Sequence, residues 1–263
     1  MALIMSIDRS YGFPSSAAGE RVVIRLGAGC GIAGAVIAIA GNALHPRTSA
    51  SEIGDTAAYL ALVNGSENWV AVHAVIVFGS LLFLFAQSAL LRVLRSTPGG
   101  LIAQVALSFA VLGGAVNLVD LLIDGTAMPE LARQWQEAAA ADQNLILHTA
   151  EAVRAVDFGL LSGIMIAFFG VPFLLFGWAT AVSGTFPRWL GLTGAAGGLA
   201  IFAVGFWQEY AGVSELTYLS FCGLVSVSNT AANPGFASPA RRPVTTAWFL
   251  LGSPWKEQPW LSR

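Results

Sequence analysis

The sequence is poor in charged residues, because only 11% of its 263 residues are Asp, Glu, Lys or Arg. A water-soluble domain carries roughly 25%, and less than half of that does not cover the surface of a globule of this size. The shortage excludes a cytosolic enzyme, a disordered chain and a nucleic-acid-binding protein. Lysine is nearly missing as well, since Lys256 is the one lysine of the chain.

Cysteine is also scarce. Cys30 and Cys222 both lie in apolar stretches, so they make neither the disulfide framework of a small secreted domain nor the paired spacing of a zinc finger. The chain contains no HExxH zinc motif and no GxSxG nucleophile motif, and its Gly-rich stretches are apolar and unlike phosphate-binding loops. No motif therefore identifies a reaction.

The chain instead contains long apolar runs. Hydrophobic residues make up 56% of the sequence, and the mean hydropathy is +0.69. About 20 residues are needed to cross the roughly 30 Å of hydrocarbon in a bilayer. Five runs are near this length, and a sixth is shorter and rich in Ser. We predict an all-α polytopic membrane bundle of about six helices, near 22–44, 69–91, 101–123, 145–180, 189–207 and 214–230. Residues 1–21 are expected to precede the bundle, and 231–263 to form an irregular tail.

Basic and acidic residues fall on opposite sides of these predicted spans. The side that carries the N-terminus holds ten of the 13 basic residues and three of the 15 acidic ones. Positive residues stay on the cytoplasmic side, so we predict a plasma (inner) membrane protein with a cytoplasmic N-terminus. In the acidic loop 124–144, Leu131, Trp135 and Ala139 recur at every fourth position, which predicts a short amphipathic helix at the interface.

Titratable side chains gather at the outer ends of the predicted helices. Helix bundles bind metals through imidazoles and carboxylates from facing helices. Zinc, iron or manganese would suit such ligands, and two histidines on different helices could also bind haem. The candidate ligands are His73, Asp120, Asp124, His148 and Glu151. Further polar residues at this end are His45, Arg154, Asp157 and Glu209.

Ordinary membrane-protein chemistry also accounts for much of this pattern. All these residues lie within about two turns of the interface, where charge costs little. His73 and Asp120 fit that explanation least, because apolar residues flank both. Three functions therefore stay open. We favour the binding of a ligand, ion or partner at the outer face. The alternatives are a metal- or haem-dependent membrane enzyme or redox subunit that uses His73, His148 and nearby carboxylates, and a structural subunit of a membrane complex.

Glycine is frequent in the predicted helices, often at a spacing of four. Small residues at this spacing let membrane helices approach closely. We predict close packing within one bundle, with a homo-oligomer or membrane-complex contact as the alternative. The pairs are Gly27-xxx-Gly31, Gly159-xxx-Gly163 and Gly194-xxx-Gly198. Pro172 lies inside the fourth apolar run, and we expect it to kink the helix without ending it.

One stretch resembles a known family of bacterial multi-pass membrane proteins, the uncharacterised DUF4386-like group. The residues that carry the resemblance are His148, Asp157-Phe158-Gly159-Leu160, Gly163, Gly170, Ser183-Gly184 and Pro187-Arg188-Trp189-Leu190-Gly191. The resemblance covers about residues 20–225 and is sharpest over 148–198. It implies a six-helix protein of the bacterial inner membrane that contacts the lipid bilayer, and it implies no reaction.

Overall fold

The computed structural model describes residues 17–46, 54–214 and 217. Within these ranges it consists of helices joined by short connections, with no strand. Five of the helical runs are long and apolar enough to cross a membrane, which agrees with the first five predicted spans. The predicted sixth span at 214–230 lies almost wholly outside the described residues, and the tail at 231–263 lies fully outside them.

Three of the spans are single helices, α1 (Ala17–Leu44), α4 (Trp69–Leu94) and α9 (Arg188–Ala211). The other two each contain a π-helical turn. α5 (Gly100–Leu122) continues through η1 (Ile123–Ala127) into α6 (Met128–Glu137), and α7 (Ala140–Ile164) continues through η2 (Met165–Gly170) into α8 (Val171–Ser183). α1 and α7 begin earlier than predicted, and the short helix predicted in the loop 124–144 is α6.

The fourth span continues past Pro172, as expected. The run from Ala140 to Ser183 is helical throughout, and Pro172 is buried near the start of α8. A proline has no N–H to donate, and its ring collides with the carbonyl four residues earlier in a regular helix. The π-helical turn η2 lies directly before this proline, and its wider spacing gives the ring room.

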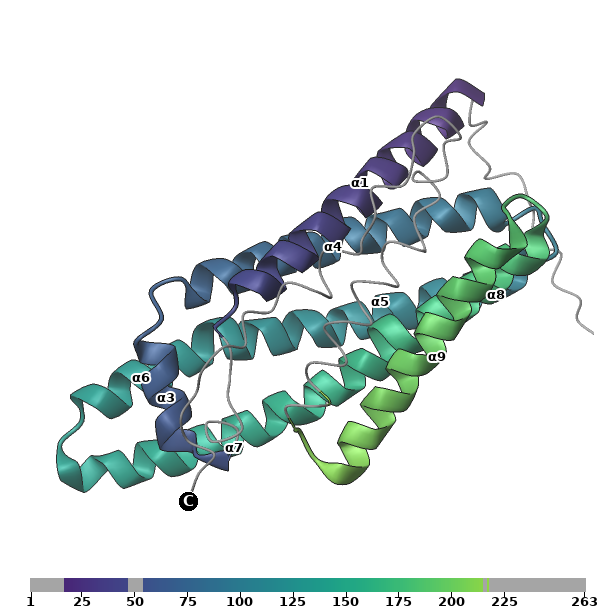
Figure 1. Ribbon diagram of the computed structural model, residues 1–263. Helices are drawn as coiled ribbons and strands as arrows, with labels where there is room; N and C mark the ends of the chain where they lie inside the picture. The colour runs from purple at the N-terminus through teal and green to yellow at the C-terminus, as the bar shows by residue number, and fades with distance from the viewer. Residues whose placement is uncertain (1–16, 47–53, 215–216, 218–263) are drawn as a thin grey trace, which may run out of the picture.

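Two of the spans are much longer than a bilayer is thick. The runs Gly100–Glu137 and Ala140–Ser183 contain 38 and 44 residues. At 1.5 Å per residue they are roughly 57 and 66 Å long, against about 30 Å of hydrocarbon. α6 and the first part of α7 therefore extend beyond the hydrocarbon together. A short helix that the sequence did not predict, α3 (Thr56–Asn64), packs against both of them (Figure 1).

This extension of the bundle has an apolar core of its own, the extension core. α3 begins at Asp55, whose side chain accepts hydrogen bonds from the backbone N–H groups of Ala57 and Ala58. The buried residues of the core come from α3, α4, α6 and α7, and they are Tyr59, Leu60, Val63, Trp69, Met128, Ala132 and Ala150. Leu131 and Trp135 of α6 pack against them, whereas Ala139 lies past the end of that helix. The extension core thus holds α3 against α4, α6 and α7 at this end of the bundle.

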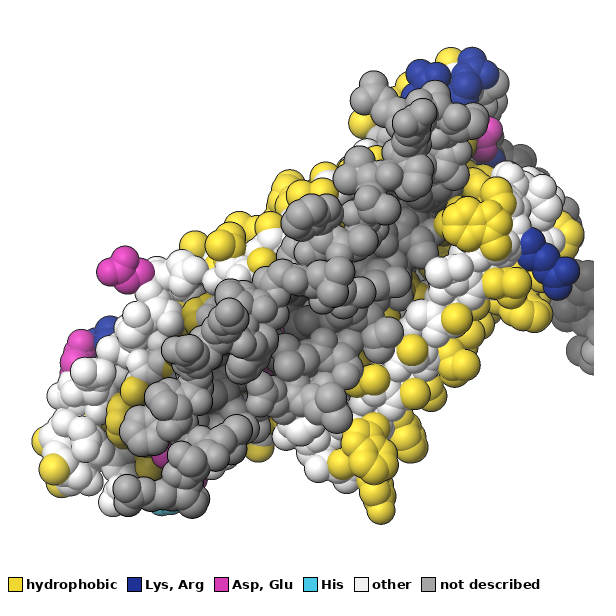
Figure 2. Space-filling model, viewed as in Figure 1, with side chains coloured by type: hydrophobic (Ala, Val, Ile, Leu, Met, Phe, Trp, Pro, Cys, Tyr) yellow, Lys and Arg dark blue, Asp and Glu magenta, His cyan; other side chains and the backbone are white. Residues whose placement is uncertain are grey.

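The lateral surface of the spans is apolar. Leu101, Trp189 and Phe206 each expose more than half of their surface, at 74%, 63% and 62%. Exposed apolar surface on this scale is unusual in a water-soluble monomer, whereas lipid accommodates it. Figure 2 shows hydrophobic side chains along α9, with most of the visible acidic side chains at the end away from the start of α1. The chain is therefore a multi-pass integral membrane protein surrounded by the lipid bilayer.

Glycines set how closely the spans approach one another. A Cβ atom on Gly191 of α9 would lie 2.3 Å from the Ala181 nitrogen in α8, and one on Gly27 of α1 would lie 2.1 Å from the Ala89 Cβ in α4. The predicted packing within one bundle holds at these positions. Gly159 differs, because a Cβ there would meet no atom within 4 Å in the part of the chain that the structure describes.

Candidate metal centre

Three potential metal ligands converge where α1, α4 and η1 meet. His45 follows the last residue of α1, His73 lies in the second turn of α4, and Asp124 lies in η1. The Nε2 atoms of His45 and His73 are 3.4 Å apart. The Asp124 Oδ2 atom lies 2.8 Å from Nε2 of His73 and 3.9 Å from Nε2 of His45. Within the described part of the chain, these three residues form a group whose ligand atoms all lie within 4.8 Å.

Backbone carbonyls determine which nitrogen of each ring faces the centre. The Nδ1 atom of His73 lies 2.7 Å from the Trp69 carbonyl oxygen, and Nδ1 of His45 lies 2.8 Å from that of Pro46. A carbonyl only accepts hydrogen bonds, so Nδ1 carries the hydrogen in both rings. In each neutral imidazole, Nε2 then presents a lone pair to the other ring and to Asp124. This is the second-shell arrangement that orients metal-binding histidines in proteins.

Lone pairs that face one another at these distances repel unless a cation lies between them. That cation is either a proton on one imidazole or a metal ion bound by all three groups. Ligand atoms at 2.0–2.1 Å from a tetrahedral zinc ion are roughly 3.3 Å apart, and the three distances of 2.8, 3.4 and 3.9 Å lie on both sides of that value. The ligand set and its spacing therefore fit a small transition-metal ion.

The same geometry is unfavourable for haem. Two axial histidines must lie on opposite faces of the flat macrocycle. Here the ring centroids of His45 and His73 are only 5.0 Å apart, and the Asp124 carboxylate lies beside both rings. No room is left between them for a porphyrin.

Two aromatic residues hold Asp124 in place. The Tyr59 hydroxyl donates to Oδ1 of Asp124 at 2.7 Å, and the Trp69 indole N–H donates to the backbone carbonyl of Asp124 at 2.7 Å. The Trp69 ring also stacks on His73, with centroids 5.3 Å apart. Oδ2 remains directed at the two histidines, because Tyr59 occupies the other carboxylate oxygen.

Close helix contact brings His73 and Asp124 together. A Cβ atom on Gly125 would lie 2.7 Å from the His73 Cβ, so a larger residue would push η1 away from α4. The π-helical turn that contains Asp124 and Gly125 adds a residue to the helical turn, and such turns are frequent at functional sites. The π-helical turn and the absence of a side chain at Gly125 therefore allow Asp124 to approach His73.

The centre is largely shielded from solvent. The side chains of His73, His45 and Asp124 are 4%, 11% and 18% exposed. Burial lowers the pKa of His45 below its ordinary value, with Asp124 acting in the opposite direction, so the neutral imidazole that a metal requires is favoured. Burial raises the pKa of Tyr59 well above its ordinary value, and the negative charge of Asp124 raises it further, so Tyr59 keeps the proton that it donates.

Two buried acids lie close to the three ligands. Asp120 and Asp157 are 8% and 6% exposed, and within the described residues the Oδ1 atom of each has no hydrogen-bond partner. Asp157 interacts electrostatically with Asp120 and Asp124. On the same turn as Asp157, Arg154 donates to the Thr56 hydroxyl at 3.1 Å, and its guanidinium lies 4.7 Å from the Tyr59 ring centroid.

The model of a protein family, "Domain of unknown function (DUF4386)", matches residues 28–235. The chain belongs to the DUF4386 family. The match covers His45, His73 and Asp124, and it extends from within α1 past the end of α9. No curated protein and no solved structure matched the chain. The resemblance seen in the sequence is thereby confirmed, and the family description assigns no activity.

In this DUF4386 protein, two of the candidate ligands named from sequence lie away from the centre. The side chain of His148 is 75% exposed, and its Nδ1 atom lies 2.8 Å from Oε2 of Glu151. Leu147, Ala150 and Val153 turn the opposite face of α7 toward the extension core. His148 and Glu151 therefore face away from it, and the structure does not bring His148 to His73. Glu209 is likewise exposed, near the end of α9.

Three residues of the centre were not predicted from the sequence to contact His73 or Asp124. His45 was predicted only as an additional polar residue, although it is a ligand candidate equal to His73. Tyr59 and Trp69 are the other two: Tyr59 donates to the Asp124 carboxylate, and Trp69 is 1% exposed and donates to the Asp124 backbone carbonyl. A buried Tyr or Trp usually needs a partner for its polar atom, but a single sequence does not reveal which one.

Proposed function

We propose that this protein is a bacterial plasma-membrane protein that binds a transition-metal ion, such as zinc, at the outer end of its helix bundle. His45 Nε2, His73 Nε2 and Asp124 Oδ2 are the ligands, and Tyr59 and Trp69 hold Asp124 in position. The observation that carries the proposal is the convergence of these three atoms, with both Nδ1 atoms directed at backbone carbonyls. Imidazole with carboxylate is a ligand set that zinc, iron and manganese accept.

The alternative cation is a proton held between His73 and Asp124. A protonated His73 would pair with Asp124 at 2.8 Å without any help from His45. The placement of His45 supports the metal, because its Nε2 lies 3.4 Å from Nε2 of His73 with its own Nδ1 hydrogen engaged elsewhere. A structural ion pair does not require this third group.

Metal binding is tested on protein purified in mild detergent. The sample is treated with a chelator, titrated with Zn²⁺ and assayed for metal by mass spectrometry, and its zinc X-ray absorption spectrum is recorded. We expect one zinc per chain, with two imidazole nitrogens at about 2.0–2.1 Å and a carboxylate oxygen in the first shell. A protein that takes up no zinc, iron or manganese, or a spectrum without imidazole ligands, would contradict the proposal.

Metal-dependent hydrolysis is a second candidate function. Catalytic zinc sites use three protein ligands and keep a fourth position for water, and this centre has three ligand candidates. Asp120 and Asp157 are buried carboxylic groups that interact electrostatically with one another, and Asp157 also interacts with Asp124, so either could supply the base for a metal-bound water. The same absorption spectrum separates the two functions, because a fourth ligand from water favours hydrolysis and a fourth protein ligand favours a structural or sensory metal.

The proposed orientation places the N-terminus in the cytoplasm and the metal centre outside. Its support is the excess of basic residues on the N-terminal side. In a background with Cys30→Ala and Cys222→Ala, we expect Ser51→Cys to react with a membrane-impermeant maleimide on intact cells. Ser96→Cys should react only after the cells are opened. The reverse labelling pattern would overturn the orientation and would place the centre on the cytoplasmic side.

A further inference from the structure

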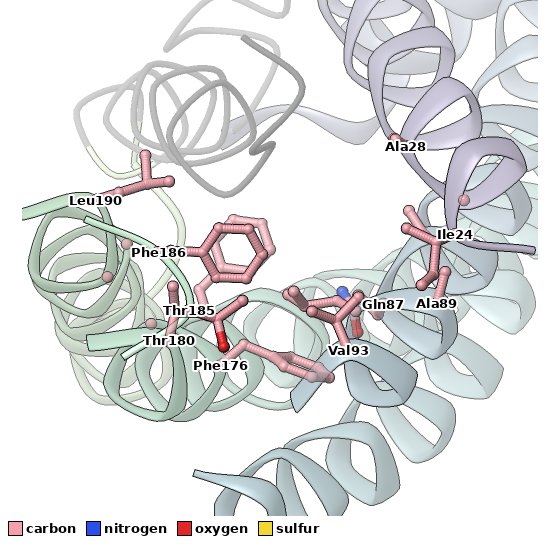
Figure 3. Close-up of a pocket in the computed structure, with 18 of the residues that line it drawn as sticks. Ile24, Ala28, Gln87, Ala89, Val93, Phe176, Thr180, Thr185, Phe186 and Leu190 are labelled. Atoms are coloured by element: carbon pink, nitrogen blue, oxygen red, sulfur yellow. The ribbon is translucent and has the colours of Figure 1, made fainter. Parts of the chain in front are cut away.

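A second site lies at the end of the bundle opposite the metal centre. There, α1, α4, α8 and α9 line a partly open cavity of about 420 Å³ (Figure 3). It extends from Phe83 in the middle of α4 to Thr185 and Phe186 in the connection between α8 and α9. This volume is in the range of small-molecule binding pockets, roughly 300–1,000 Å³.

One polar side chain inside this cavity has no partner. Gln87 of α4 is 5% exposed, and within the described residues neither its amide nitrogen nor its amide oxygen makes a hydrogen bond. Figure 3 shows the amide of Gln87 in the space between Ile24 and Ala28 on one side and Phe176 and Phe186 on the other. Burying an amide without hydrogen-bond partners costs free energy. A ligand group that hydrogen-bonds to Gln87 would remove this cost and would therefore bind favourably.

The remaining lining indicates the chemistry of that group. It is made largely of apolar side chains, among them four phenylalanines, with Thr180 and Thr185 near the α8–α9 connection. None of the described lining residues carries a charge. A charged head group would lose its hydration here without meeting an opposite charge, whereas a neutral carbonyl or hydroxyl group needs only the amide of Gln87.

We infer that this cavity binds an uncharged lipid-like molecule whose carbonyl or hydroxyl group hydrogen-bonds to Gln87. The apolar part of the ligand packs among the phenylalanines, and Gln87 donates through Nε2 to a carbonyl or accepts through Oε1 from a hydroxyl. This site shares no residue with the metal centre, so either assignment stands without the other.

The inference is tested with a matched pair of photoreactive probes on the full chain in lipid nanodiscs. One probe is a diazirine-bearing long-chain fatty alcohol, and the other is the fatty acid of the same chain length, ionised at pH 8. We expect the alcohol to label peptides of α4 and α8, and the acid to label them at least about ten-fold less. Decylubiquinone, a neutral carbonyl compound, should compete with the alcohol.

Three variants connect the labelling to the cavity. Gln87→Leu removes the amide at similar size and should weaken labelling about five- to ten-fold. Ala28→Trp leaves Gln87 in place, fills the cavity and should abolish labelling. The control is Gln104→Leu, the same change at an exposed position on α5, which should label as the wild type does. Size-exclusion chromatography and circular dichroism check that each variant is folded.

Several results would overturn the inference. These are the absence of labelling in α4 and α8, equal labelling by the acid and the alcohol, and labelling that persists in a folded Ala28→Trp variant. If Gln87→Leu does not fold, the comparison of Ala28→Trp with Gln104→Leu still decides whether the cavity is occupied.

Discussion

Replacing His73 by alanine is expected to abolish stoichiometric zinc binding. The variant removes one of three ligands. The Trp69 indole that stacks on His73 cannot replace it, because the indole nitrogen carries a hydrogen that it donates to the Asp124 carbonyl. Loss of an outer-shell partner alone typically costs 10- to 100-fold in metal affinity, so we expect a loss greater than about 100-fold for a ligand. Zinc content and a competition titration with a coloured chelator measure the change.

The matched variants decide whether the three residues act together. His45→Ala and Asp124→Asn should lose the same ion, whereas His148→Ala should keep it, because His148 is exposed and bonded to Glu151. His45 lies beyond the last residue of α1, so its loss is the mildest structural change of the three. Full zinc binding by a folded His45→Ala variant would show that His45 is not a ligand and would contradict the proposed three-residue centre.

Replacing Gly198 by leucine is expected to be the most destabilising single change among the helix contacts. A Cβ atom there would lie 2.2 Å from the Leu174 nitrogen and 2.7 Å from the Phe173 carbonyl carbon. Both are backbone atoms of α8, which have no rotamer to move aside. Overpacking costs about 1–3 kcal/mol where side chains can adjust, so we expect at least the upper end of that range here. Unfolding in mixed detergent and sodium dodecyl sulfate micelles measures the free energy.

The control for this variant is Gly29→Leu on α1. Among the described residues, a Cβ at Gly29 would meet no atom within 4 Å, and the substitution improves helix propensity. We therefore expect this variant to unfold at the same detergent composition as the wild type or a higher one. Equal stability of the Gly198 and Gly29 variants would mean that α8 and α9 do not pack at contact distance.

The sequence by itself determined the class of the fold and the end of the molecule at which polar chemistry gathers. Five spans follow from hydropathy, because an apolar run of this length has no other low-energy environment than lipid or a large core. The placement of His73, Asp120 and Asp124 near the same end of the spans follows from their positions within those runs. The continuation of the helix past Pro172 also follows from the apolar residues after it.

Tertiary structure alone decided which of these polar residues meet. His45 joins His73 because α1 packs along α4, and Asp124 joins both because Gly125 lets η1 approach to contact. His148 stays outside because the opposite face of α7 is buried against α3 and α6, a packing that its sequence spacing from Glu151 does not reveal. Hydropathy is a property of each segment, whereas the rotation of one helix against another depends on contacts between residues far apart in the chain.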